Sequence, residues 1–425
     1  MTKEQGGQGD SRFVATDLTR TIDALWRIES ARLIGGLTRV VRDVGLAEEF
    51  AQDALVAALE QWPRSGVPDN PGAWLMASAK HRAIDQLRRG SLIARKHEAL
   101  ANQLERSLTP DLDAALDEHV ADDLLRLTFI SCHPVLPTEA RVALTLRLLG
   151  GLTTAEIARA FLVPEPTIAQ RIVRAKKSLA EAKVPFEVPR GAELTERLAS
   201  VLGVIYLVFN EGYSATAGDD WMRPGLCEDA LRLGRILAQL APQETEVHGL
   251  LALMELQHSR SAARVGPGGL PVLLLEQDRS KWNQLFIRRG LAELERAGGV
   301  EGPYALQAAI AACHARAPTA DETDWRRIAS LYDQLVALTP SPVIELNRAV
   351  AHSMAFGPGA GLALLTPLMT EPALKGYHLL PSVRGDLLEK LGRPEEARAE
   401  FEKAASLTQN SRERALLLAR AKANS

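Results

Sequence analysis

One segment of this 425-residue chain carries side chains that could read a nucleic acid. Helical spacing places four apolar residues on one face: Ile168, Ile172, Ala175 and Leu179. Another face would carry Thr167, Gln170, Arg171 and Arg174, whose polar groups can hydrogen-bond base edges and phosphates. A short helical stretch at 152–161 and a turn at 162–165 come just before it. This order predicts a helix-turn-helix, with a plain helical hairpin that has a basic outer face as the alternative.

Charge is distributed unevenly along the chain, although its net charge is only −3. Residues 80–97 hold six Lys or Arg against one acid, and residues 156–177 hold five against two. Between them, residues 98–123 hold eight acids and one base. Two basic segments joined by an acidic connector are typical of a protein that meets a polyanion at two places. Either basic segment alone would fit an ordinary solvated helix face.

Residues suited to metal binding or catalysis are fewer. Glu255 and His258 form a Glu-x-x-His pair, and Glu244 and His248 lie one turn apart nearby. A di-iron site in a helical bundle needs a second such pair, and we find none in the sequence. The three cysteines lie too far apart for a disulfide framework or close metal-ligand spacing: Cys132, Cys227 and Cys313. We therefore expect no cofactor, no metal and no catalytic residue, and a helical metal-dependent enzyme in the C-terminal half is one alternative.

The elements that would position these residues are all helical. Ala, Leu, Arg and Glu dominate, and apolar residues recur at helical spacing, which predicts an all-α fold. We expect helices over 17–44, 46–62 and 73–89, with Gly45 ending the first and a loop rich in Pro and Gly at 63–72. A second helical unit is expected over 121–183, followed by a boundary at Val184–Pro189.

The last part of the chain repeats itself. Residues 332–339 resemble residues 401–408, an offset of 69, and a further helical apolar stretch at 362–366 lies halfway between them. A period near ~34 residues is that of tetratricopeptide repeats, which are stacked helix pairs. The longest strongly apolar run, 201–209, falls far short of the ~20 residues that span a bilayer. Because the N-terminus also has no apolar core, we expect a cytoplasmic protein with no membrane partner.

Three motifs in order resemble those of bacterial RNA polymerase sigma factors of the extracytoplasmic-function type. Residues 45–54, GLAEEFAQDA, resemble the acidic signature of sigma region two, and residues 73–89 resemble the helix of that region that reads the minus-ten element. Residues 137–175 resemble sigma region four. Residues 210–214, 249–254 and 276–282 resemble the long C-terminal extension of one subgroup with tetratricopeptide-like repeats.

The resemblance implies a division into domains. It implies a mobile tail at 1–16, region two at 17–97, an acidic linker at 98–120 and region four at 121–185. A helical extension domain at 186–300 and the repeats at 301–425 would follow. The implied function is to bind core RNA polymerase and direct it to promoters. The implied role of the extension is regulation, through a protein or peptide ligand on a concave surface.

The resemblance also assigns roles to individual residues. Four would face the basic β′ clamp helices of the polymerase: Glu48, Glu49, Gln52 and Asp53. Six would contact the minus-ten element: Asn70, His81, Arg82, Asp85, Arg88 and Arg89. Five would read the minus-thirty-five element: Thr167, Gln170, Arg171, Arg174 and Lys177.

Two departures from the family pattern predict an altered promoter preference. His81 stands where Asn is common in region two, and Pro166 stands where Gly is common in region four. A helix-turn-helix regulator that acts without polymerase is the competing interpretation. The acidic run at Glu48 and the helix that begins near Trp74 favour the sigma factor.

Overall fold

The computed structural model describes residues 8–89, 112–161, 163–214, 222–267 and 271–424. The described part is helical and contains no β-strand, only an isolated bridge between Val265 and Pro271. The predicted all-α fold is therefore confirmed. The chain divides into two compact units, Met1–Val204 and Ile205–Ser425.

The first unit begins with a small bundle. It consists of α1 (Gln8–Val41), α2 (Val44–Ser65) and α3 (Pro71–Arg89), against which α5 (Leu112–Ser131) also packs. Its core holds Leu37, Phe50, Trp62 and Leu75, none of them more than 2% exposed. Trp62 also meets Trp74 edge to face, with ring centroids 5.3 Å apart. This core fixes α2 and α3, the two helices with the predicted region-two contacts.

The ends of these helices differ from the prediction. The helix α1 starts at Gln8, so part of the expected tail at 1–16 is helical. It ends at Val41 rather than at Gly45, because Arg42 adopts a left-handed φ of 56° and Asp43 caps α2 by accepting hydrogen bonds from Gly45 N and Leu46 N. The helix α2 continues through Pro63, since a proline so near the C-terminus removes only one hydrogen bond from the last turn.

Part of the predicted acidic linker is helical. Residues 90–111 lie outside the described residues, but α5 begins at Leu112, inside the segment expected to be a linker. One connector acid, Asp123, is buried and pairs with Arg39 of α1 at 3.1 Å and with Arg126 at 2.8 Å. The paired carboxylate explains the difference, because a helix packed on α1 places this acid beside cations from two helices.

The helix-turn-helix is present as predicted. It follows α6 (Thr138–Leu148) and consists of α7 (Thr154–Phe161) and α8 (Glu165–Glu181). A capping box starts α7, because Glu156 N donates to Thr153 Oγ1 at 3.1 Å and Thr153 N donates to the Glu156 carboxylate at 2.8 Å. Pro166 lies in the first turn of α8, where its missing N–H costs nothing.

The extension starts inside the first unit. The helix α9 (Ala192–Tyr213) contains the division between the units, which falls after Val204 rather than near Pro189. Two side chains of its first half bind carbonyls at the end of α5: Arg197 donates to Phe129 O at 2.8 Å, and Ser200 donates to Cys132 O at 2.7 Å. The last carbonyls of a helix have no partner within it, so these bonds tie α9 to the predicted region four.

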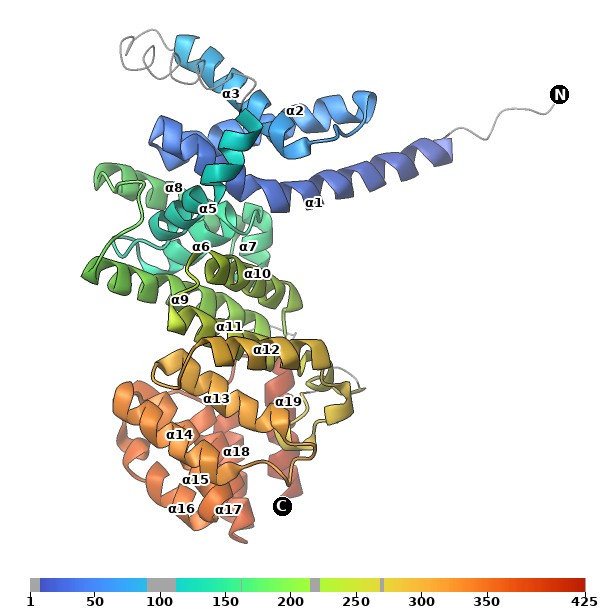
Figure 1. Cartoon of the computed structure of the whole chain (residues 1–425). Helices are drawn as coiled ribbons and strands as arrows, with labels where there is room; N and C mark the ends of the chain where they lie inside the picture. Colours follow the sequence, from blue (N-terminus) through green and yellow to red (C-terminus); the bar gives the residue numbers. More distant parts are fainter. Residues whose placement is uncertain (1–7, 90–111, 162, 215–221, 268–270, 425) are drawn as a thin grey trace, which may run out of the picture. The chain divides into compact units, whose positions relative to one another are not determined.

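The second unit is a succession of helices, each packed on its neighbours along the chain (Figure 1). It contains α10 (Pro224–Leu240), α11 (Thr245–His258), α12 (Gln284–Arg296), α13 (Pro303–Arg316), α14 (Trp325–Leu338), α15 (Pro342–Phe356), α16 (Pro358–Leu365), α17 (Leu379–Lys390), α18 (Pro394–Leu407) and α19 (Ser411–Ala423). The helices α14 and α18 are offset by 69 residues at both ends, which is the predicted repeat. The stretch halfway between them lies in α16, so three helix pairs begin at 325, 358 and 394.

Candidate polymerase and promoter interface

The helix α8 presents the predicted reading face to solvent. Its four predicted apolar residues, Ile168, Ile172, Ala175 and Leu179, are all buried. Gln170, Arg174 and Lys177 are exposed, and Thr167 and Arg171 are partly exposed. The structure therefore brings the five predicted residues together on the outer side of one helix, with Val173 among them at 65% exposure. Such a surface offers amide and cationic donors and an apolar contact to a groove.

The helix α2 divides its acidic cluster between two environments. Glu49 is exposed, and Gln52 and Asp53 are partly exposed, so these three form an outer ridge on one side of the helix. Val56 and Leu59, which lie on the following turns, are also exposed. Carboxylates beside exposed apolar side chains suit a protein partner with a basic surface.

Glu48 does not belong to that ridge. It is 2% exposed, and its Oε1 accepts a hydrogen bond from Arg147 Nε of α6 at 2.6 Å. Its Oε2 pairs with Lys176 of α8, and Gln52 Nε2 also donates to Oε1. Burial alone would raise the pKa of Glu48, but Lys176 and Arg147 together hold it below its usual value. Glu48, which we expected to face the polymerase together with the other three residues, is buried in this conformation. Its side chain lies about 100° around the helix from that of Glu49 and points toward α6 and α8.

The helix α3 carries the predicted minus-ten residues. His81 is exposed and Arg82 is partly exposed, while the side chains of Asp85, Arg88 and Arg89 lie outside the described residues. Asn70 is exposed, but its Oδ1 accepts a hydrogen bond from Ala73 N at 3.0 Å and so caps α3. Lys80 is buried, and burial together with Arg39 lowers its pKa to about 8.

The candidate metal ligands of the extension have other partners. Glu255 is buried against Arg235, with an Oε1–Nη2 distance of 2.7 Å, and burial raises its pKa. His258 packs edge to face on Phe286, and His248 Nδ1 lies 2.7 Å from the Glu293 carboxylate. Glu244 precedes the first turn of α11. Within the described ranges, no three His, Cys, Asp or Glu side chains gather in a way that could hold a metal ion.

The three cysteines are free thiols that are at least partly buried. Cys132 and Cys227 are buried, and burial raises the pKa of both thiols, that of Cys227 to about 12. Cys313 is partly buried, and burial also raises its pKa. Thiols held in their neutral form are poor nucleophiles and poor metal ligands.

Sequence reasoning missed the residues that join the two sigma-like parts. Arg147 and Lys176 hold Glu48, and Arg27 of α1 pairs with Glu156 of α7 at 2.6 Å. These partners are separated by about a hundred residues or more in the chain, so no local spacing connects them. The only local sign is that Lys176 falls outside the arc of Gln170, Arg174 and Lys177 on α8.

Family models match three parts of the chain. Sigma-70 region 2 matches residues 25–92, and Sigma-70 region 4 matches residues 126–179. A family of unknown function, DUF6596, matches residues 197–298. These matches place the class of protein among the sigma factors of RNA polymerase.

Relatives cover both halves of the molecule. An uncharacterised protein of Rhizobium meliloti (strain 1021) is 46% identical over 90% of this chain and 91% of its own length. The ECF RNA polymerase sigma factor SigK of Mycobacterium sp. (strain KMS) is 31% identical over 38% of this chain and 87% of its own length. The chain belongs to the extracytoplasmic-function sigma factor family, and it carries a long helical extension.

The remaining findings concern a solved structure and the hydropathy of the helices. A tetratricopeptide repeat protein from Parabacteroides merdae aligns with a TM-score of 0.35 and 14% identity, over 80% of this chain and 99% of that chain. Among the residues that the structure describes, none of the helices has both the length and the hydropathy of a membrane span.

Proposed function

We propose that this sigma factor binds core RNA polymerase through the outer ridge of α2 and places promoter DNA against α3 and α8. Glu49, Gln52 and Asp53 would face the basic clamp helices of the β′ subunit. Surface charges of opposite sign speed encounter and set the register of two partners. The protein would act in the cytoplasm and perform no covalent chemistry of its own.

The observation that supports the proposal best is the exposed face of α8. The outward position of Gln170, Arg174 and Lys177 follows from the burial of the opposite face. The second helix of a helix-turn-helix enters the major groove with such a face. Thr167 and Arg171, at the sides of this face, would add contacts to bases or phosphates of the minus-thirty-five element.

The minus-ten contacts would come from α3 and from the loop before it. His81 and Arg82 are accessible on α3, and the loop at 65–70 is largely exposed. Opening the duplex requires a pocket for an unstacked base, and contacts must offset its cost of a few kcal/mol. We expect Asn70 to act indirectly, by fixing the start of α3. Asp85, Arg88 and Arg89, further along the same helix, would contact the minus-ten element.

Run-off transcription tests this proposal directly. The full chain is added to core polymerase with a DNA library, and the selected promoters are sequenced. We expect transcripts that depend on the chain, and we expect the double variant Arg171→Ala, Arg174→Ala to lose them while it still binds core polymerase. If the chain binds DNA but never associates with core polymerase, the competing interpretation, a regulator that acts without polymerase, replaces the proposal.

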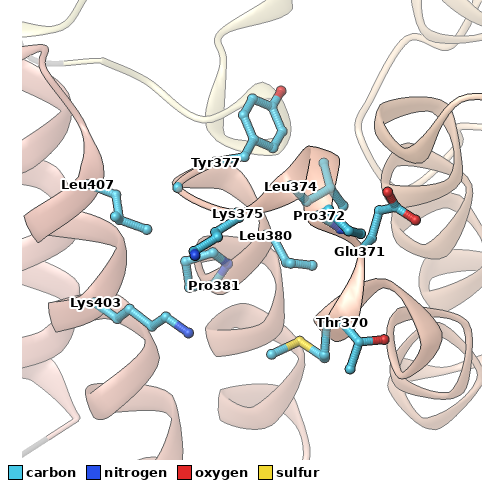
Figure 2. Close-up of a pocket in the computed structure, with 12 residues that line it drawn as sticks. Thr370, Glu371, Pro372, Leu374, Lys375, Tyr377, Leu380, Pro381, Lys403 and Leu407 are labelled. Atoms are coloured by element: carbon cyan, nitrogen blue, oxygen red, sulfur yellow. The ribbon is translucent and has the colours of Figure 1, made fainter.

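The extension supports a regulatory role through a pocket in its last repeats. A cavity of about 460 Å³ lies among α17, α18 and the short turns Pro367–Thr370 and Pro372–Leu374. Its wall includes Met369, Leu380 and Leu407, and Figure 2 shows Lys375 and Lys403 reaching toward the same space. We propose that it takes a peptide with a carboxylate next to an aliphatic side chain, because two cations border an apolar wall.

One acid also borders this pocket, but it is already engaged. The carboxylate of Glu371 accepts a hydrogen bond from Ala373 N at 3.2 Å.

A Lys375→Glu, Lys403→Glu variant of the full chain reverses the two positive charges at the pocket. It should therefore lose the response of transcription to the ligand peptide and keep basal transcription. An unchanged response in this variant would remove the pocket from the proposal.

A further inference from the structure

Two segments of the extension, residues 210–214 and 276–282, meet at a buried cation. The first ends α9 with Tyr213, and the second ends with Trp282. Arg260 follows α11, and its Cζ lies 5.9 Å from the centre of the Tyr213 ring and 5.8 Å from that of the Trp282 ring. All three residues fall in the range that matches the family of unknown function. The surfaces proposed for polymerase and promoter use neither segment, so this meeting point needs its own explanation.

Two more guanidinium groups lie at the same two rings. The Cζ of Arg264 lies 3.4 Å from the centre of the Tyr213 ring, and that of Arg279 lies 4.9 Å from the centre of the Trp282 ring. Each ring is therefore shared by Arg260 and one further cation. Arg260 is 9% exposed and Arg264 is 7% exposed. Three positive charges thus gather in a place that is largely shielded from water.

These cations repel one another. Burial lowers the pKa of Arg264 and of Arg279, and the charge of Arg260 lowers both further. Burial, together with Arg260 and Arg279, lowers the pKa of His314 to about 3, so this imidazole stays neutral at physiological pH. Surroundings that disfavour another positive charge to this extent favour a negative one.

Two of the three arginines complete helix ends. Arg264 Nη1 donates to Tyr213 O at 2.7 Å, at the end of α9. Arg279 Nη1 donates to His314 O at 2.7 Å and to Ala317 O at 2.6 Å, at the end of α13. The last carbonyls of a helix need such donors, and the negative end of its dipole favours a cation. These two arginines therefore have a structural role that requires no ligand.

The position of Arg260 is not explained in this way. Its Nη2 donates to the side-chain oxygen of Gln257, which is neutral, and no Asp or Glu in the described ranges forms an ion pair with it. Three buried nitrogen atoms near it have no hydrogen-bond partner among the described residues: Arg279 Nε, Trp282 Nε1 and His314 Nδ1. A buried cation without an anion and buried donors without acceptors both cost free energy. A bound anion would offset both costs.

The number and type of these donors favour a phosphoryl group. It offers roughly two negative charges and three acceptor oxygens, and guanidinium groups bind such oxygens in pairs. A carboxylate offers only one charge. The burial of Arg260 and Arg264 keeps out the backbone of a DNA duplex, whereas the partly exposed Arg279 leaves access for a small molecule. The site therefore suits a small phosphorylated ligand.

We propose that Arg260, with Arg264, Arg279 and Trp282 around it, binds a phosphoryl group, as inorganic phosphate or as the phosphate monoester of a small metabolite. The bound group joins the end of α9 to the segment before α12 and so stabilises this part of the extension. The site shares no residue with the pocket beside α17 and α18. Its test requires no polymerase, so the site and the proposed function can fail independently.

Calorimetric titration of the full chain with inorganic phosphate, in a chloride buffer of constant ionic strength, tests the site. We expect about one phosphate per chain, and a melting temperature that rises with phosphate concentration. Arg260→Gln should lose at least about tenfold in affinity because it lacks the charge-assisted hydrogen bonds, and Arg260→Lys should lose less because it keeps the charge. Arg288→Gln removes the same charge from an exposed position on α12 and should bind phosphate as the parent does.

Trp282→Phe provides a second variant should Arg260→Gln fail to fold. It keeps an aromatic ring beside the guanidinium groups but removes the Nε1 donor, so phosphate affinity should fall by about threefold. Equal binding by this variant and the parent would then remove the site.

Glucose 6-phosphate in the same titration identifies the source of the phosphoryl group. Tighter binding than that of inorganic phosphate assigns a phosphate monoester, and weaker binding assigns phosphate itself. A parent chain that binds neither compound at millimolar concentration overturns the proposal. Equal affinity of the parent and a folded Arg260→Gln for phosphate overturns it as well.

Discussion

The helices α2 and α8 both carry dense charge, but they place it differently. On α8 the cations and amide at 170, 174 and 177 all face solvent, opposite a fully buried apolar stripe. On α2 the acids are split, with Glu49 exposed and Glu48 buried against two cations. One helix therefore keeps its binding surface open, and the other has part of its surface already occupied within the molecule.

This difference shows what a charge pattern can predict. Helical spacing separates a buried stripe from a polar face. On α8 this was enough to predict the polar face, because that face is exposed in the described part of the chain. On α2 the polar residues span more than one face, and the side that meets region four is buried as well. A charged residue on an amphipathic helix can thus find its partners inside the molecule, where helical spacing alone does not reveal them.

The largest expected effect comes from the core that holds α2 in place. Trp62 is 2% exposed and packs on Trp74, so Trp62→Ala should lower the free energy of unfolding of this bundle by about 3–5 kcal/mol. Promoter binding by α8 should persist, because its buried stripe packs within region four. Thermal melting followed by two probes, one in the bundle of α1, α2 and α3 and one in region four, measures the change in stability of each. Equal loss of both parts would mean that α2 and α8 depend on one shared core.

A buried lysine of α3, Lys80, predicts a dependence of stability on pH. Burial, with a contribution from Arg39, lowers the pKa of Lys80 to about 8, below the ~10.4 expected in the unfolded chain. Between these values the unfolded chain binds more protons, so the free energy of unfolding should rise with pH, by about 2 kcal/mol from pH 8 to 10. Lys80→Met should remove this rise when chemical unfolding is compared across that range. The same rise in Lys80→Met as in the parent would assign it to another group.

Much of the fold could be predicted from the sequence because its signals are local. The buried stripe of α8, the capping box at Thr153 and the offset of 69 residues between α14 and α18 all follow from spacing within short segments. Helix ends were less predictable, since Arg42 and Pro63 behave against their usual preferences. Tertiary packing decides such cases.

The candidate site was predictable only in part, for a related reason. The reading face of α8 depends on one helix, and its residues lie where the spacing predicts. The environment of Glu48 depends on Arg147, 99 residues further along the chain, and no periodicity reports such a pair. Asn70 shows the same limit on a smaller scale, because its side chain caps α3.

A smaller effect should test the exposed cations on the reading face of α8. Arg174→Ala removes one predicted contact, so promoter binding should weaken by about 1–2 kcal/mol, and the slope of log affinity against log salt should fall by about one. Titration of a labelled promoter fragment at several salt concentrations measures both. Lys183→Ala, beyond the reading face, is the matched control. An unchanged slope in Arg174→Ala would place this guanidinium away from the DNA backbone.

The smallest expected effect concerns the open side of α2. Asp53 is partly exposed at the proposed polymerase interface, so Asp53→Asn should weaken core binding by at most about 1 kcal/mol, mainly through slower association at low salt. Glu60→Gln, an exposed acid nearly two turns further along α2, is the matched control. The measurement is the association rate with core polymerase at two salt concentrations. An equal association rate for Asp53→Asn and Glu60→Gln at low salt would remove Asp53 from the polymerase interface.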